Sequence, residues 1–266
     1  MIRAIGHLRI LRLTALAVLI STPAAAQDAS PQELVTDRPD QTESSNIVPL
    51  GWFQLETGLA HEKAVDFSSE SIADTLVRIG IGRGFELRVG LSGYQSIDLP
   101  SGPAIKRLGD SSIGFKLGLA EERGARPEIA LLVGTTLPTG SSDLTSDRAD
   151  PSFRFTLANT LTERLSLGTN AGIAWRTEPD ATGNMNTLSV FEWTAALGIG
   201  ATDVLSFFVE LYGESELSAK RSDALFDGGV TYLIRPNVQF DVAAGVDLSD
   251  SRIWFAGAGI SFRLPH

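Results

Sequence analysis

Cysteine is absent from this 266-residue chain, and histidine occurs only three times. Without cysteine the chain has no disulfides, no thiolate metal sites and no cysteine nucleophile. His7 lies in a segment that we expect to be removed, so only His61 and His266 remain. Metal or acid–base chemistry based on histidine is therefore not expected, and we predict that the protein has no cofactor and is not an enzyme.

Long apolar runs and an excess of positive charge are also missing. After residue 26 no stretch approaches the roughly 20 apolar residues that a membrane-spanning helix needs. The net charge is −10, which argues against nucleic acid as a partner because phosphate binding requires a basic face. Even so, 43% of the residues are hydrophobic and 26 are glycine. Membrane β-barrels escape the usual hydropathy signal because lipid-facing and lumen-facing residues alternate along each strand.

The first 26 residues are typical of a secretory signal peptide. Three arginines, Arg3, Arg9 and Arg12, precede a short apolar run over 13–20, and small residues at Ala24–Ala26 then offer a cleavage site. The apolar run is too short for a membrane anchor. We predict export and cleavage after Ala26. The mature chain, 27–266, loses three arginines and no acid, so its net charge falls from −10 to −13.

From Gly51 onward, segments of about ten residues alternate in polarity and are separated by turn residues. This pattern predicts antiparallel strands. We expect an all-β fold, a transmembrane up-and-down β-barrel of about twelve strands over residues 50–266. The expected strands are 51–61, 73–82, 85–95, 111–119, 127–137, 152–161, 165–176, 188–200, 204–214, 225–235, 238–247 and 252–263.

The two faces of these strands differ sharply in charge. Positions that share the parity of the apolar residues carry almost no charged side chain, whereas the opposite parity is rich in both signs. A soluble sandwich would place the charged face in water, but a membrane barrel places it in the lumen. The charges either neutralise one another in a filled lumen or line a selective pore. The predicted pore-lining residues are Glu56, Arg78, Glu86, Arg88, Lys116, Arg154, Glu210, Asp227 and Asp241.

The connections between the expected strands alternate in length. Long ones at 62–72, 96–110, 138–151, 177–187 and 215–224 are separated by short ones such as 83–84, 162–164, 201–203 and 236–237. Membrane barrels have short periplasmic turns and longer external loops, so both chain ends should be periplasmic. The connections at 120–126 and 248–251 fit this rule less well.

Residues 27–49 show no strand period and form a leader before the barrel. Its densest polar group is Asp37, Arg38, Asp40 and Glu43. We consider three alternatives: a partial plug that is ion-paired to the lumen, a solvated periplasmic tail, or a cation site made by the three carboxylates. The first two are favoured, and no metal is expected.

A resemblance begins in the same leader. Residues 34–44, Leu-Val-Thr-Asp-Arg-Pro-Asp-Gln-Thr-Glu-Ser, are followed by Val-Pro-Leu-Gly at 48–51 and Gln-Leu-Glu-Thr-Gly at 54–58. This pattern resembles a family of outer-membrane transporters named for the meta-pathway of phenol degradation. Pro138-Thr139-Gly140 also matches that family. The resemblance implies an outer-membrane barrel that transports small molecules, among which aromatic compounds are suggested by the family name.

Together these patterns favour a channel or transporter for small molecules in the outer membrane of a Gram-negative bacterium. The alternative is a structural barrel with a filled lumen that transports nothing. Glycines at lumen parity, including Gly58 and Gly259, favour some open space and hence the channel. A membrane-embedded enzyme ranks last, because His61 has no companion serine in a recognisable motif. The expected partners are outer-membrane lipid, a small-molecule solute and the barrel assembly machinery.

Overall fold

The computed structural model describes residues 34–142, 144–179, 184–218 and 221–265. The predicted signal peptide and the first part of the leader lie outside these residues. Within the described residues every regular element is a strand. The strands are β1 (Trp52–Lys63), β2 (Ser68–Gly82), β3 (Phe85–Leu91), β4 (Tyr94–Asp98), β5 (Ile105–Leu108), β6 (Ser111–Ala120), β7 (Glu128–Leu137), β8 (Asp150–Thr162), β9 (Leu165–Pro179), β10 (Met185–Gly200), β11 (Leu205–Glu216), β12 (Arg221–Arg235), β13 (Val238–Asp247) and β14 (Trp254–Pro265).

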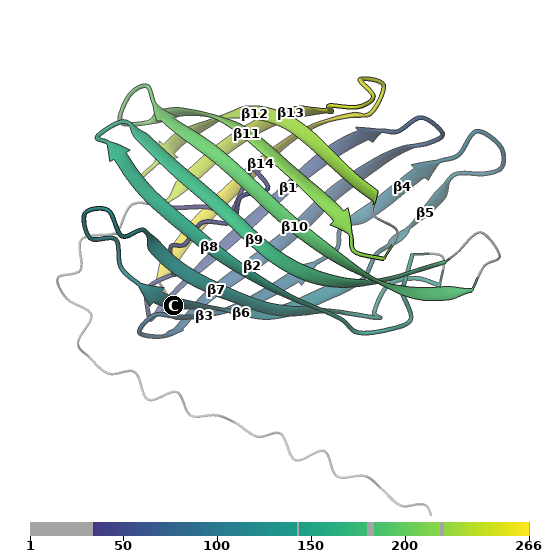
Figure 1. The fold of residues 1–266 in the computed structure, drawn as a ribbon, viewed down its shortest axis with the longest axis horizontal. Coiled ribbons are helices and arrows are strands. Elements are labelled where there is room, and N and C mark those ends of the chain that lie inside the picture. Colours follow the sequence, from purple (N-terminus) through teal and green to yellow (C-terminus); the bar gives the residue numbers. More distant parts are fainter. Residues whose placement is uncertain (1–33, 143, 180–183, 219–220, 266) are drawn as a thin grey trace, which may run out of the picture. The chain divides into compact units, whose positions relative to one another are not determined.

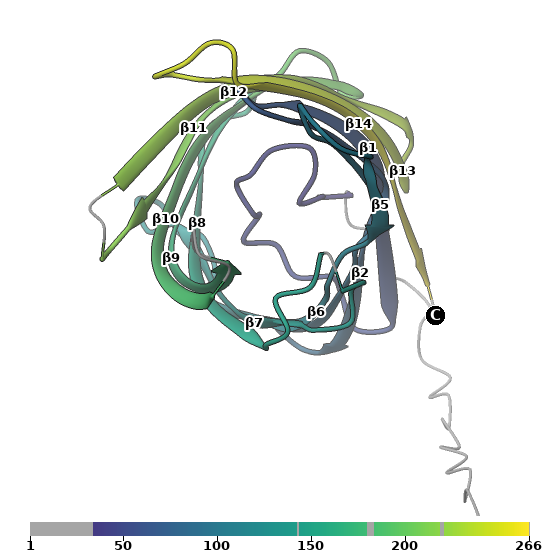
Figure 2. The ribbon, with the colours of Figure 1, turned by 90° about the vertical axis from the view of Figure 1, so that its right-hand side faces the viewer.

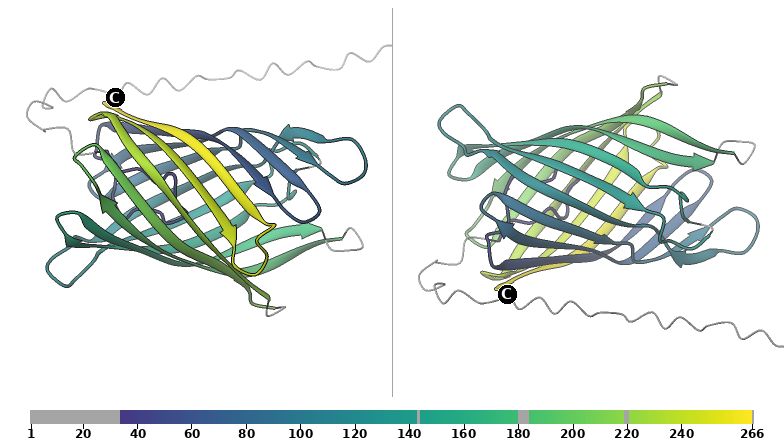
Figure 3. Two further views of the ribbon diagram at one scale, coloured as in Figure 1. Left: turned by 90° about the horizontal axis from the view of Figure 1, so that it is seen from above. Right: turned by 90° about the horizontal axis from the view of Figure 1, so that it is seen from below.

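Twelve of the strands close into one antiparallel barrel. The order is β1-β14-β13-β12-β11-β10-β9-β8-β7-β6-β3-β2, and β2 pairs again with β1 to close the ring. Figure 2 shows the ring from one open end of the barrel. The two views of Figure 3 show how strongly the strands tilt. Closure leaves no open sheet edge in the ring, which is what a sheet needs in a lipid environment. The predicted fold, an all-β barrel of twelve antiparallel strands, is confirmed.

The strands extend further at one end of the barrel than the sequence predicts. β1 and β2 are joined by only four residues, 64–67, where a long connection over 62–72 was expected. The region 96–110 contains most of a hairpin, β4–β5, which continues β3 and β6 and projects beyond the ring (Figure 1). Alternation in polarity marks only the part of a strand that separates two different environments. Beyond that band the backbone pairing continues without a pattern in the side chains.

The two ends of the barrel differ in their connections. At one end, here called the turn end, the short turns 83–84, 163–164 and 236–237 lie beside the start of β1 and the close of β14. The other end, here called the loop end, carries the connections 99–104, 138–149 and 248–253. In Figure 1 the turn end is on the left, where the C-terminus is marked.

The barrel is charged inside and apolar outside. The largest fully buried side chains include Arg78, Lys116, Gln54, Glu56 and Glu86, each less than 2% exposed. Large apolar side chains face outward instead. Examples with a third to a half of their surface exposed are Phe153, Phe155, Phe191, Phe207, Val209, Phe226, Tyr232, Phe240, Val242 and Trp254. This is the reverse of a soluble protein, and it matches a barrel whose outer face contacts lipid.

A segment without strand structure, residues 34–49, lies inside the barrel; we call it the lumen segment. Figure 2 shows it as a purple loop within the ring. It joins β1 at the turn end, where Trp52 N donates a hydrogen bond to Pro49 O. Gly80 makes this course possible, because a Cβ there would lie 2.0 Å from Pro49 O. A glycine on the lumen face of β2 therefore lets the chain pass close to the wall.

Candidate functional site

Asp37 of the lumen segment lies at the centre of a buried group of three cations. Its Oδ2 is 2.6 Å from Arg88 Nη1, 3.0 Å from Arg78 Nη1 and 3.0 Å from Lys116 Nζ. Ser44 also donates to Asp37 Oδ1, from its backbone N at 2.8 Å and its Oγ at 2.7 Å. Burial would raise the pKa of Asp37, but the attraction of Arg78, Lys116 and Arg88 lowers it well below its ordinary value. Asp37 is therefore ionised and ties the segment to β2, β3 and β6.

The same cations are shared with two glutamates of the wall. Arg78 contacts Glu56 at 3.0 Å and Glu86 at 2.8 Å, and all three side chains are fully buried. Each glutamate also accepts a hydrogen bond from the backbone of the lumen segment, Glu56 from Asp37 N and Glu86 from Val48 N. Because burying a charge is costly, removing one partner from such a group typically costs about 3–5 kcal/mol. The network therefore fixes the segment to one side of the wall.

The opposite wall holds the segment mainly through hydrogen bonds to one carboxylate. Glu210 on β11 accepts bonds from Gln41 N at 2.8 Å and Thr42 Oγ1 at 2.5 Å. Asp40 lies nearby without a cation such as those around Asp37. Burial raises the pKa of Asp40 well above its ordinary value, and the negative charges of Glu210 and Asp227 add to the shift. The segment thus presents an ionised carboxylate to one wall and a carboxyl group with a raised pKa to the other.

Arg38 spans part of the lumen towards β13. Its Nη2 lies 3.1 Å from Asp241 Oδ1, and Asp241 is fully buried. Gly58 and Gly259 make room for this side chain, since a Cβ on either would lie about 2.5 Å or less from the guanidinium. The sequence suggested that glycines at lumen parity leave open space. At these two positions that interpretation is wrong, because the space is filled by Arg38.

Glu43 begins a line of alternating charges that leads away from the buried network. Its Oε2 is 2.6 Å from Arg88 Nη2, and its Oε1 is 3.8 Å from Arg154 Nη1. Arg154 in turn contacts Glu192 at 2.6 Å, and Glu192 contacts Arg176 at 2.5 Å. The arginines of this line are progressively more exposed, with 9% for the Arg88 side chain, 26% for Arg154 and 37% for Arg176, whereas the Glu192 side chain between the last two is 12% exposed. The line therefore connects the buried network with the more open part of the lumen.

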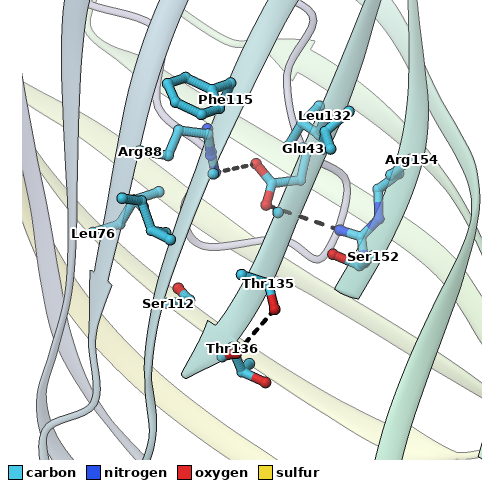
Figure 4. A pocket seen from close by; sticks show the side chains of 14 residues that line it. Glu43, Leu76, Arg88, Ser112, Phe115, Leu132, Thr135, Thr136, Ser152 and Arg154 are labelled. Atoms are coloured by element: carbon cyan, nitrogen blue, oxygen red, sulfur yellow. Dashed lines mark hydrogen bonds and ion pairs between the residues drawn. The ribbon is translucent and has the colours of Figure 1, made fainter. Parts of the chain in front are cut away.

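Several cavities border the lumen segment, and two of them lie next to Glu43. One, of about 310 Å³, is lined by Glu43, Arg88 and Arg154 together with residues of β2, β6, β7 and β8 (Figure 4). The other, of about 350 Å³, is lined by residues of the segment and by Glu128, Thr160 and other residues near the turn end. Glu43 lines both cavities. The segment therefore separates two spaces inside the barrel.

The structure brings most of the candidate residues into contact with one another. Four contacting groups account for them: Asp37 with Arg78, Arg88 and Lys116; Glu56 and Glu86 with Arg78; Glu43 with Arg88 and Arg154; and Arg38 with Asp241. Glu210 binds the segment backbone, and Asp227 lies opposite Glu210 in the β11–β12 pairing. The candidate cation site does not form, because Arg88 contacts both Asp37 and Glu43, while Asp40 faces other carboxylates. Among the described residues, no group of three acids or histidines has the arrangement to hold a metal ion.

Several uncharged side chains also hold the segment, and the sequence did not single them out. Gln54 Nε2 donates to Val35 O at 2.9 Å, and Asn170 Nδ2 donates to Glu43 O at 3.0 Å. The hydroxyls of Ser45 and Thr156 are 3.0 Å apart. The wall residues share the lumen parity of the charged residues, which is the one signal that could have found them.

Across the described part of the chain, no helix has the length and hydropathy needed to cross a bilayer.

Comparisons with solved structures identify the same architecture. The chain is similar to the COG4313 outer membrane channel from Pseudomonas putida F1, with a TM-score of 0.67 and 12% identity over 82% of this chain and 97% of that one. It is also similar to the NanC porin, with a TM-score of 0.56 and 13% identity over 79% of this chain and all of that one. At this identity the likeness establishes the fold. No curated protein matches the chain.

The sequence itself matches one protein family, described as "Putative MetA-pathway of phenol degradation", over residues 36–264. The match begins in the lumen segment, just before Asp37, and runs to the last residues of β14. It therefore covers the barrel together with the polar residues that hold the segment, and it confirms the resemblance found at residues 34–58. The chain belongs to the MetA-pathway of phenol degradation family.

Proposed function

We propose that this protein is an outer-membrane channel for small molecules, and that the lumen segment closes it in the state described here. The observation that carries the proposal is the ion-pair network around Asp37. It fastens a segment without strand structure across a barrel lumen that has a cavity on either side. A segment held only by ion pairs and hydrogen bonds can detach from the barrel wall and rebind. A strand of the barrel cannot leave without breaking the ring.

The apolar outer face supports a location in the outer membrane. Short turns mark the periplasmic end of membrane barrels, so the turn end and the start of β1 face the periplasm. The lumen segment then closes the periplasmic half of the channel. The solved structures with this fold include proteins whose names describe a channel and a porin, which agrees with this role.

The family description supports a small aromatic compound as the solute. We propose that the solute moves passively, down its own concentration gradient. We propose no catalytic role for the protein. A barrel with a permanently filled lumen is the rival, and the density of buried charge around Arg78 favours it.

Asp37→Asn tests the channel against the filled barrel. The substitution removes the charge that Arg78, Arg88 and Lys116 share, so the lumen segment should detach more often and the protein should conduct more. The measurement is ion conductance of the purified protein in planar bilayers. Asp98→Asn is the matched control, because Asp98 is exposed on β4 outside the ring, and it should conduct like the unchanged protein.

The rival makes a different forecast for the same experiment. A structural barrel with a filled lumen gives no conductance steps for either protein under any condition, although the barrel is folded. That outcome, with folding verified by heat-modifiable mobility in gels, would contradict the proposed channel.

A further inference from the structure

The cavity on the loop-end side of the lumen segment has a charged floor made by two guanidinium groups. Arg88 on β3 and Arg154 on β8 reach it from different strands, and Glu43 of the segment lies between them (Figure 4). The cavity measures about 310 Å³, which is within the range of sites for small organic molecules. The two arginines therefore form an anion site, and the carboxylate of Glu43 occupies it.

The two arginines engage Glu43 unequally. Arg88 Nη2 donates a hydrogen bond to Glu43 Oε2 at 2.6 Å, whereas Arg154 Nη1 stays 3.8 Å from Glu43 Oε1, beyond hydrogen-bond distance. Arg154 also holds Glu192, through its other terminal nitrogen, at 2.6 Å. A carboxylate that is free to move could approach Arg154 more closely than Glu43, whose position is set by the backbone. Planar guanidinium groups favour such paired contacts with a carboxylate.

The walls of the cavity suit the body of a small organic acid. Gly114 and Gly134 are paired on β6 and β7, so no side chain stands on this patch of wall. Leu76 and Leu132 border it, and they supply apolar surface beside the charged groups. A flat apolar group can lie against such a surface while its charged end contacts the arginines.

Three hydroxyl groups complete the lining. Ser112, Ser152 and Thr136 lie on neighbouring strands at lumen parity. Within the described part of the chain, neither serine hydroxyl makes a hydrogen bond to another residue. They are available to a second polar substituent on the solute, and this favours an acid that also carries a hydroxyl group.

Glu43 also borders the space beyond this cavity. It lines both this cavity and the one of about 350 Å³ on the turn-end side. A group that replaces its carboxylate at Arg88 and Arg154 leaves Glu43 without its ion-pair partners. The side chain then no longer holds this part of the segment against the wall.

We propose that the cavity binds a small organic monocarboxylate with a flat apolar body, and that Glu43 is an internal carboxylate which the solute displaces. This inference rests on the proposed channel function and gives its solute class: an aromatic carboxylate rather than a neutral phenol. Displacement frees the Glu43 side chain, which lines both cavities, while the Asp37 network continues to hold the rest of the lumen segment.

Binding of benzoate and benzamide to the full mature protein, measured by titration calorimetry in detergent, tests the charge requirement. The two probes share a shape but only benzoate carries a charge. Benzoate should bind at least tenfold more tightly than benzamide. Arg154→Gln should weaken benzoate binding at least tenfold and leave benzamide unchanged, while Arg164→Gln, in the turn between β8 and β9, should change neither. Equal affinities for the two probes, or unchanged benzoate binding in Arg154→Gln, would overturn the proposal.

Glu43→Gln supplies a gain that misfolding cannot imitate. Removing the internal carboxylate removes the competitor, so benzoate should bind more tightly than to the unchanged protein. Weaker binding would show that Glu43 supports the site instead of occupying it, which would also overturn the proposal. Ion conductance of the same preparations separates this inference from the channel function. Conductance without benzoate preference refutes only the solute class, and benzoate binding without conductance refutes only the channel.

Discussion

At the scale of single residues, two aspartates three positions apart in the lumen segment experience opposite surroundings. Asp37 faces Arg78, Lys116 and Arg88, which keep its pKa well below the ordinary value despite its burial. Asp40 is buried beside Glu210 and Asp227, and its pKa is raised well above the ordinary value. We therefore expect the lumen segment to respond to pH through different groups at different pH values.

Asp40 predicts that the segment is held less tightly as the pH rises. We call the lumen segment docked when it is bound to the barrel wall. A carboxyl group whose pKa is raised in the docked state stabilises that state fully below the ordinary pKa of 3.8. This stabilisation is lost as the pH rises through the higher docked value. Conductance in planar bilayers should therefore increase between pH 4 and neutral pH. The increase should be smaller in Asp40→Asn, which cannot ionise beside Glu210 and Asp227.

The pKa of Asp37 is shifted in the opposite direction, so Asp37 affects docking in a lower pH range. Its pKa is lowered, so its contribution to docking is present above 3.8 and is lost only as the pH falls below that value. The two aspartates can thus be separated by pH. If Asp40→Asn and the unchanged protein gave the same conductance profile above pH 4, Asp40 would not be the group that responds.

At the scale of elements, the lumen segment differs from the strands in how it is held. Each barrel strand is fixed by backbone hydrogen bonds to two neighbours, as β10 is by β9 and β11. The lumen segment is fixed by side chains of the wall, among them Glu56, Glu86 and Glu210, which accept its backbone N–H groups. Satisfying these buried backbone groups is a condition for an irregular segment to lie inside a barrel.

A reversible crosslink can test whether this element moves. The chain has no cysteine, and the hydroxyl oxygens of Ser45 and Thr156 are 3.0 Å apart across the boundary between segment and wall. In Ser45→Cys/Thr156→Cys, oxidation should lock the segment to β8 and lower the conductance. Reduction should restore it. Each single cysteine variant is the control and should not respond to oxidant.

Unchanged conductance in the oxidised double variant would contradict a moving segment, provided that the disulfide is shown to form. The formation of the bond can be read from gel mobility with and without reductant. A segment that is only a permanent filling would give the same conductance in both states.

At the scale of the whole molecule, the barrel keeps its charged residues inside and its apolar residues outside. The interior is held together by ion pairs and hydrogen bonds, while outward side chains such as Phe155 and Val209 remain half exposed. In water this arrangement would leave a wide apolar belt in contact with solvent, which soluble monomers rarely tolerate. A lipid environment is what makes this surface stable.

The lipid environment predicts how exposed positions respond to charge. Val242 is 38% exposed in the middle of β13, and Leu248 is 60% exposed in the connection after it. Val242→Arg should lower the free energy of unfolding in bilayers by about 2–4 kcal/mol, because arginine at the midplane of a barrel is that unfavourable. Leu248→Arg should change it by no more than about 0.5 kcal/mol. Denaturant titration in lipid vesicles measures both, and equal effects would mean that the apolar belt does not face lipid.

Most of the barrel followed from the sequence because each strand carries its own signal. In β3, β6 and β13 polarity alternates with a period of two, which identifies strands such as Val238–Asp247 to the residue. The ends of the strands at the loop end could not be predicted from the sequence. At 62–72, for example, backbone pairing continues where the side chains no longer alternate in polarity. The hairpin β4–β5 was missed for the same reason.

The charged residues of the lumen were also readable from parity, since a strand sends alternate side chains to opposite faces. Their partners were not. The contact of Asp37 with Lys116 joins residues 79 positions apart, and that of Arg38 with Asp241 joins residues 203 apart. Only closure of the ring brings β13 and the lumen segment together.

The sequence by itself therefore determined the strands, their two faces and the family, because these depend on local periodicity and on one short polar motif. The tertiary structure decided where residues 34–49 lie, that Arg38 fills the space left by Gly58 and Gly259, and that Glu43 is placed between Arg88 and Arg154. The physical reason is that a charge carries no information about its partner along the chain. Its partner is fixed only when distant strands enclose a common space from which water is largely removed.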